Sequence, residues 1–288
     1  MSLRRDGYCV VRDVLDRRLL ARLRARTAAL LAALPASHRQ RQRATGSLVH
    51  IAADPAFAAL IAWPQALAAL DAQGLGDARF SSGYVISKPP HAPPLFWHQD
   101  WWGWDHPSSY AGAIRQVFLM YYLADTTIEN GCLRVVPGSH RRRHALHDRL
   151  ASAHAERLAR ASDLNDPAFA PVAEERPVPV RAGDLVIGDA RLLHGAYANR
   201  TAAERPLITL WYHPHFARQP AAIRARVARI LHREGVDTDP GGDERPFPEG
   251  WPKAARQRIA PLVADYDGRA APLPWNRHPD PRRLRGTA

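Results

Sequence analysis

The stretch Leu95-Phe96-Trp97-His98-Gln99-Asp100-Trp101-Trp102 combines an apolar, aromatic run with one histidine and one carboxylate two residues apart. Such a run predicts a β-strand, in which side chains at i and i+2 leave the same face. We therefore expect His98 and Asp100 to point to one side. A neutral imidazole and a carboxylate together suit a divalent metal, and one further histidine would complete the two-histidine, one-carboxylate triad that holds non-haem Fe(II).

A histidine and an aspartate at this spacing are weak evidence alone, because the chain has 14 histidines. The tail repeats the spacing in His278-Pro279-Asp280, but there the sequence is rich in proline and arginine, and Pro279 cannot donate to a strand ladder. Only the first pair lies in an aromatic strand and has a matching third ligand far downstream. We expect the metal site at the first pair.

The length allows two ordinary domains or one large β-barrel or sandwich with appended helices. We expect one domain over residues 1–288, mainly β with flanking helices. Two cysteines, Cys9 and Cys132, are too few for a disulfide scaffold and fit a reducing cytoplasm. The first residues lack the apolar region of a secretory signal, and no uncharged apolar run reaches about 18 residues. We expect a soluble, cytoplasmic protein with no membrane partner.

The formal net charge of +12 raises the question of nucleic-acid binding, which needs basic residues gathered on one face. Here the basic residues are spread along the chain, and only Arg141-Arg142-Arg143 forms a run. All 40 basic residues except Lys88 and Lys253 are arginine. Part of the charge therefore reflects a general preference of this chain for arginine, and we do not expect a nucleic-acid partner.

Hydrophobic periodicity divides the chain into three parts. Residues 1–77 read as a helical scaffold, with a helix over 14–34 capped by Asp16, a polar loop over 37–45, and short helices over 56–61 and 64–73. From residue 78 to 213 the hydrophobic period changes to two, which predicts strands. This region is interrupted by an insertion over 141–179, for which we expect a helix over 141–161 and irregular structure over 163–179. Residues 214–288 read as a helix over 220–233 and a wrapping tail anchored by Trp251, Tyr266 and Trp275.

Three blocks in the strand-rich region resemble the phytanoyl-CoA dioxygenase family of Fe(II)/2-oxoglutarate oxygenases. They are Trp97-His98-Gln99-Asp100, then the run Asn130-Gly131-Cys132-Leu133-Arg134-Val135-Val136-Pro137-Gly138-Ser139-His140, then His194-Gly195 with Arg205 eleven residues beyond the histidine. Order and spacing match over about residues 80–213. The resemblance implies a double-stranded β-helix, a cupin-like jelly roll whose mouth holds iron.

The resemblance also implies roles for five residues. His98, Asp100 and His194 would be the iron ligands, with a satisfied core histidine as the plainer interpretation of His194. Arg205 would bind the distal carboxylate of 2-oxoglutarate, because a guanidinium stays charged when buried and holds carboxylates in bidentate fashion. Lys88 would assist it, although the same lysine could equally be a solvated charge at a strand end.

Weaker expectations concern the walls of the site. If Met120 faces the iron, alternation brings Gln116 to the same face, and Gln116 and Tyr84 become candidate cosubstrate contacts. The tryptophans at 97, 101 and 102 could pack in the core or contact substrate. Where some family members carry a serine or threonine two residues after the distal histidine, this chain has Ala196, so cosubstrate binding would depend more on Arg205 and Lys88.

The activity implied by the resemblance is a dioxygenase that consumes O2 and 2-oxoglutarate, oxidises a small molecule and releases succinate and CO2. Natural-product and amino-acid-derived intermediates are among the substrates of such enzymes. Asp100 fills the position that halogenating members leave open for chloride, so we expect hydroxylation. Two alternatives remain open: a cupin-like metal or ligand binder without turnover, and a nucleic-acid demethylase of the same chemistry.

Overall fold

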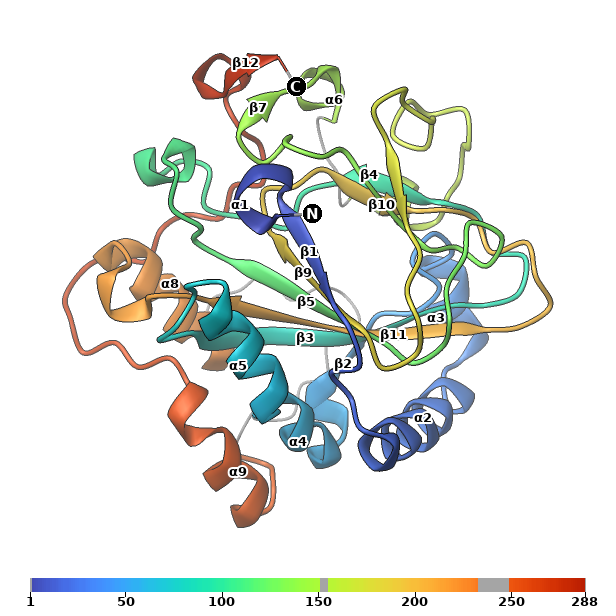
Figure 1. The fold of residues 1–288 in the computed structure, drawn as a ribbon, viewed down its shortest axis with the longest axis horizontal. Helices are drawn as coiled ribbons and strands as arrows, with labels where there is room; N and C mark the ends of the chain where they lie inside the picture. The colour runs from blue at the N-terminus through green and yellow to red at the C-terminus, as the bar shows by residue number, and fades with distance from the viewer. Residues whose placement is uncertain (1, 151–154, 233–248, 288) are drawn as a thin grey trace.

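The computed structural model describes residues 2–150, 155–232 and 249–287, and its core is a jelly roll of two antiparallel sheets (Figure 1). Within the larger sheet the strands run in the order β1 (Tyr8–Val11), β9 (Leu185–Asp189), β5 (Val117–Tyr122), β11 (Arg205–His213), β3 (Arg79–Lys88) and β2 (Val49–His50). The smaller sheet has the order β4 (Leu95–His98), β10 (His194–Ala196), β6 (Leu133–Val135) and β8 (Arg176–Val178).

Side chains alternate across the larger sheet between two apolar clusters. On β5, Leu119 and Tyr121 face the helices, whereas Phe118, Met120 and Tyr122 face the smaller sheet and form the barrel interior with Leu133 and Val135. The helices α2 (Arg17–Ala32), α4 (Ala58–Ile61) and α5 (Pro64–Ala72) cover the outer face, below the sheet in Figure 1. The barrel interior therefore lies between the two sheets, on the face of the larger sheet opposite the helices.

The expected helix over 14–34 is confirmed as α2, and the side chain of Asp16 caps it by accepting the N–H of Leu19 at 2.6 Å. Three other expectations were wrong. Residues 1–77 are not purely helical, because β1 and β2 join the larger sheet; the loop over 37–45 contains α3 (Ala36–Arg41); and residues 163–179 include β8.

The insertion and the tail also differ from the expected elements. Instead of one helix over 141–161, the structure has β7 (Arg142–Arg143), α6 (Ala145–Arg149) and α7 (Glu156–Ala159), and residues 151–154 lie outside the described part. The tail contributes α8 (Ala221–His232), α9 (Lys253–Ile259) and β12 (Arg285–Thr287), which pairs with β7. The end of the expected helix at 233 and the start of the tail to 248 also fall outside the described residues.

By length and composition alone, the window Pro55–Ala72 could cross a membrane, and 39% of it is buried. The structure divides this window into a 3-10 turn (Pro55–Phe57), α4 and α5. Its buried side chains, among them Phe57, Leu60 and Leu70, belong to the core beneath the larger sheet. The window thus consists of core helices in this fold.

Candidate metal and cosubstrate site

Strand pairing brings the two candidate histidines together. His98 ends β4 and His194 begins β10, and the two are direct partners in the antiparallel register. Their ring centroids lie 4.1 Å apart, and Phe118 of β5 packs against the His194 ring at 4.8 Å. A pair of residues almost a hundred positions apart in sequence thus meets at one point of the barrel wall.

Asp100 completes the group. The candidate ligand atoms of His98, Asp100 and His194 all lie within 4.8 Å of one another, and all three residues are buried. Each oxygen of the Asp100 carboxylate faces one ring, with Oδ1 3.6 Å from His98 Nε2 and Oδ2 3.6 Å from His194 Nε2. Two imidazoles and a carboxylate are the donor set of a non-haem Fe(II) site, so these residues fit that metal.

Hydrogen bonds orient both rings for metal binding. Nδ1 of His98 lies 3.0 Å from the Phe96 carbonyl, and Nδ1 of His194 lies 3.0 Å from the Leu192 carbonyl. Because a carbonyl oxygen only accepts, each Nδ1 carries the proton and each Nε2 presents its lone pair to the space beside Asp100. Burial, then the nearby His194, lowers the pKa of His98 to about 3, which keeps the imidazole neutral as a ligand must be.

Trp211 of β11 holds the carboxylate from the opposite side of the barrel. Its indole Nε1 donates to Asp100 Oδ2 at 2.9 Å. Sequence reasoning missed this residue. The available signal was alternation along β11, which places Leu207 and Trp211 on the interior face with Arg205.

Arg205 is buried in the same barrel, with 3% of its surface exposed. Its Nε and Nη1 have no hydrogen-bond partner, and no carboxylate pairs with it in the described part of the chain. Burial lowers the pKa of its guanidinium. A buried cation without a counter-charge is costly, so this arrangement calls for an anionic ligand.

Lys88 lies directly opposite Arg205 in the pairing of β3 with β11. The lysine is 1% exposed, so a solvated strand-end charge is excluded. Its Nζ donates to the carbonyl of Ala44 at 2.9 Å and to that of Pro93. A protonated lysine has three N–H donors, so one N–H remains available for a ligand. Burial, then repulsion from Arg205, holds the pKa of Lys88 well below its usual value. An acid bound here would be met by two cationic side chains.

The weaker candidates divide by location. Met120 lies in the barrel interior and accepts a hydrogen bond from the Tyr122 hydroxyl at 3.7 Å, and Tyr84 packs its edge against Trp211 with ring centroids 6.0 Å apart. Gln116 is buried just before β5, its Nε2 3.5 Å from His213 Nε2 and its Oε1 without a partner. Thr209, which sequence reasoning missed, is also buried with an unpartnered hydroxyl.

The three tryptophans for which core packing and substrate contact were both open lie outside the barrel. Trp97 leaves β4 on the face opposite His98, where its indole donates to the Ala170 carbonyl at 2.8 Å. Trp101 and Trp102 pack beneath the C-terminal segments, and Trp102 stacks on Trp275 with centroids 5.5 Å apart. We therefore interpret these three as packing residues.

The C-terminal tail reaches the site through that stack. Asn276 donates its backbone N–H to the Trp102 carbonyl at 2.8 Å, next to the segment that carries Asp100. The charge of the following residue, Arg277, contributes to the low pKa of His98. By contrast, His278 and Asp280 join no metal-ligand group among the residues that the structure describes.

A jelly roll that buries two histidines and a carboxylate in the same barrel as an arginine and a lysine is typical of the Fe(II)/2-oxoglutarate-dependent class of enzymes. The sequence model of the phytanoyl-CoA dioxygenase (PhyH) family matches residues 3–207 of the 288. The chain belongs to the phytanoyl-CoA dioxygenase family.

Individual relatives agree with this assignment. The chain is 25% identical over 139 residues to a probable alpha-ketoglutarate-dependent hypophosphite dioxygenase of Stutzerimonas stutzeri, a match that spans 47% of this chain and 45% of that protein. The alpha-ketoglutarate-dependent epimerase SnoN, solved with Fe3+, alpha ketoglutarate and nogalamycin RO, superposes with a TM-score of 0.55 at 25% identity, covering 74% of this chain and 80% of SnoN. HygX of Streptomyces hygroscopicus, with nickel and 2-oxoglutarate bound, shares the fold at 20% identity, with a TM-score of 0.56 over 74% of this chain and 85% of HygX.

Proposed function

We propose that the protein is an Fe(II)/2-oxoglutarate-dependent dioxygenase that hydroxylates, or otherwise oxidises, a small organic molecule and releases succinate and CO2. The observation that carries this proposal is the buried Arg205, whose Nε and Nη1 lack partners inside the barrel that also holds the triad. A metal binder without a cosubstrate would have no use for such a cation, whereas the distal carboxylate of 2-oxoglutarate requires one.

In this proposal, His98, Asp100 and His194 hold the iron, which supplies the oxidising chemistry with O2. The carbonyls of Phe96 and Leu192 keep both rings oriented by accepting the Nδ1 protons. Trp211 fixes the Asp100 carboxylate so that one oxygen remains directed at the metal position.

Cosubstrate binding is assigned to the opposite end of the interior. Arg205 would donate from its free nitrogens to the distal carboxylate, and Lys88 would add the remaining Nζ donor and a second positive charge. The unpartnered hydroxyl of Thr209 lies on β11 between Arg205 and Trp211, so it is suited to contact the cosubstrate along its length. Burial of all these groups excludes water, which strengthens each electrostatic contact.

The substrate is proposed to enter beside Tyr84 and Trp211. Both side chains face the barrel interior and are only partly buried, so one side of each is open to solvent. SnoN binds nogalamycin RO and is named an epimerase, so this scaffold supports outcomes other than hydroxylation. Here we propose oxygen insertion, because Asp100 supplies an anionic oxygen ligand where a halogenase would bind chloride. The two cysteines are free and buried, in keeping with a proposed cytoplasmic setting.

The test is turnover with labelled O2. The Fe(II)-loaded protein is incubated with 2-oxoglutarate and a panel of natural-product and amino-acid-derived candidates in chloride-rich buffer, with succinate release and product mass as readouts. We expect substrate-stimulated succinate and one labelled oxygen in the product of the wild-type chain and of His278→Ala, and neither from Asp100→Ala. A chlorinated product, or full activity of Asp100→Ala, would contradict the role of Asp100.

A further inference from the structure

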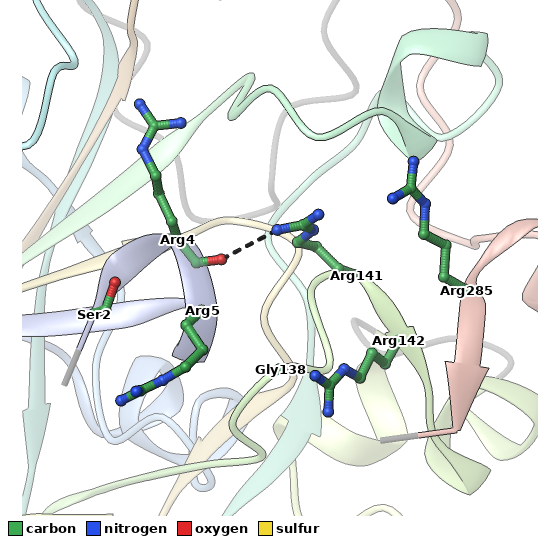
Figure 2. Close-up of a pocket in the computed structure, with 7 residues that line it drawn as sticks. All are labelled: Ser2, Arg4, Arg5, Gly138, Arg141, Arg142 and Arg285. Carbon is green, nitrogen blue, oxygen red and sulfur yellow. Dashed lines mark hydrogen bonds between the residues drawn. The ribbon is translucent and has the colours of Figure 1, made fainter.

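A second concave site lies away from the barrel interior. A pocket of about 340 Å³ is lined by seven residues: Ser2, Arg4, Arg5, Gly138, Arg141, Arg142 and Arg285 (Figure 2). They come from α1 (Leu3–Asp6) and its N-terminal flank, the turn between β6 and β7, β7 itself, and β12. None of them belongs to the triad or to the cosubstrate end.

The lining carries five guanidinium groups and no carboxylate. Arg5 is compensated by Asp6 at 2.8 Å, a contact that raises the pKa of Arg5. The other four arginines have no ion pair within residues 2–150, 155–232 and 249–287. The next residue along the chain, Arg143, differs because it pairs with Asp148 at 3.0 Å.

Backbone contacts hold the segments that line this pocket together. Gly138 donates its N–H to the Asp6 carbonyl at 3.0 Å, which fixes the turn against α1. Arg285 donates its backbone N–H to the Arg141 carbonyl at 3.2 Å and is the register partner of Arg142 in the parallel pairing of β12 with β7. Figure 2 also shows the Arg141 side chain reaching the carbonyl of Arg4, at 3.4 Å. The five arginines are exposed, and their summed positive charge would attract an anion to this surface.

We propose that this pocket binds the pyrophosphate group of a small nucleoside diphosphate-like molecule. Guanidinium forks match pairs of phosphate oxygens. In Figure 2 the Arg4 side chain points away from those of Arg141, Arg142 and Arg285, so three uncompensated forks remain, and these suit more than one phosphate. The volume lies at the lower end of the roughly 300–1,000 Å³ typical of small-molecule sites, which is large for a single ion. A concave pocket lined by segments from both ends of the chain favours a compact ligand over the extended phosphate track of a nucleic acid.

Calorimetry on the full-length, metal-free chain at low salt tests the proposal, with pyrophosphate, ADP and inorganic phosphate as probes. We expect one equivalent of pyrophosphate or ADP to bind, and inorganic phosphate to bind more weakly. The double variant Arg141→Gln, Arg285→Gln should weaken pyrophosphate binding by at least about tenfold, because it removes two charge-assisted contacts. The neighbouring Arg143→Gln, whose arginine already has a carboxylate partner, is the matched control and should bind as the wild type does.

Three results would overturn the proposal. The first is no detectable binding of pyrophosphate and ADP at millimolar concentration. Equal weakening by Arg143→Gln is the second, since it would reflect net charge alone. The third is tighter binding of a short DNA duplex or of anionic vesicles than of ADP, with the same dependence on Arg141 and Arg285. His194→Ala should leave pyrophosphate binding unchanged, so this proposal and the proposed oxygenase activity can fail separately.

Discussion

Replacement of Arg205 by methionine should have opposite effects on cosubstrate binding and on the stability of the protein without ligands. Loss of one partner of a buried charge pair costs about 2–5 kcal/mol, which corresponds to roughly 30- to 4,000-fold in the dissociation constant for 2-oxoglutarate. In the absence of 2-oxoglutarate the guanidinium has unpartnered Nε and Nη1 atoms. An unsatisfied buried polar group costs about 1–3 kcal/mol, so Arg205→Met should raise the free energy of unfolding by about 2 kcal/mol or more.

Arg191 offers a matched control, because it is equally buried, at 2% exposure, but fully partnered. Its Nη2 lies 2.7 Å from Asp189 Oδ2, and its Nη1 donates to the carbonyls of Ser109 and Ala111 at 2.8 and 2.9 Å. Arg191→Met leaves the Asp189 carboxylate buried without its partner and should lower the free energy of unfolding by about 3–5 kcal/mol.

The assay is urea denaturation of the metal-free proteins together with calorimetric titration of 2-oxoglutarate into the Fe(II)-loaded, oxygen-free proteins. The two arginine variants should move stability in opposite directions. If Arg205→Met destabilises the protein as Arg191→Met does, or binds 2-oxoglutarate within about threefold of the wild type, then Arg205 is a structural residue and its assignment to the cosubstrate is wrong.

Three further predictions concern neighbouring groups. Lys88→Met should weaken 2-oxoglutarate binding less than Arg205→Met in the same titration, because Nζ already donates to two carbonyls; an equal or larger loss would contradict this ranking. Trp211→Phe removes the hydrogen bond to Asp100 and should weaken Fe(II) binding by about 10- to 100-fold in a metal titration, whereas unchanged affinity would show that the contact is incidental. Burial lowers the pKa of His213 to about 3, so the unfolded chain takes up its proton first as the pH falls below about 6.5. Because of this histidine, the free energy of unfolding should fall by about 1.4 kcal/mol more between pH 7.5 and pH 5.5 than it would without it. In urea denaturation at these two pH values, the decrease should be smaller by that amount in His213→Gln than in the wild type.

The local hydrophobic pattern was sufficient to predict those helices and strands whose apolar residues recur with a clear period. Leu19, Leu23 and Leu31 recur at helical spacing behind a capping aspartate, and they are the buried face of α2. The sequence of α3 has no apolar stripe, and its one buried side chain, His38, is held by accepting the backbone N–H of Leu48 at 3.1 Å. A helix stabilised by such a distant contact has no local signature.

Long-range pairing limited the remaining predictions. Strand β1 has only four residues and is stabilised by its register with β9, so its sequence resembles any short apolar run. The spacing of His98 and Asp100 predicted that both side chains point to the same side of the strand. The resemblance added His194, and the structure brings its candidate ligand atom within 4.8 Å of those of the other two residues. Trp211 could not be predicted as the partner of Asp100, because their contact depends on how β11 lies across the barrel from β4.

The central claim is that His98, Asp100 and His194 bind an iron that 2-oxoglutarate then chelates. Its most direct test is an oxygen-free absorption titration of the Fe(II)-loaded protein with 2-oxoglutarate, which reports the charge-transfer band of a 2-oxo acid chelated to Fe(II). We expect a saturable band at one equivalent of iron in the wild-type chain and in His278→Ala, and no band in His194→Ala. The absence of a band in the wild-type chain, or an equal band in His194→Ala, would contradict the assignment of this site.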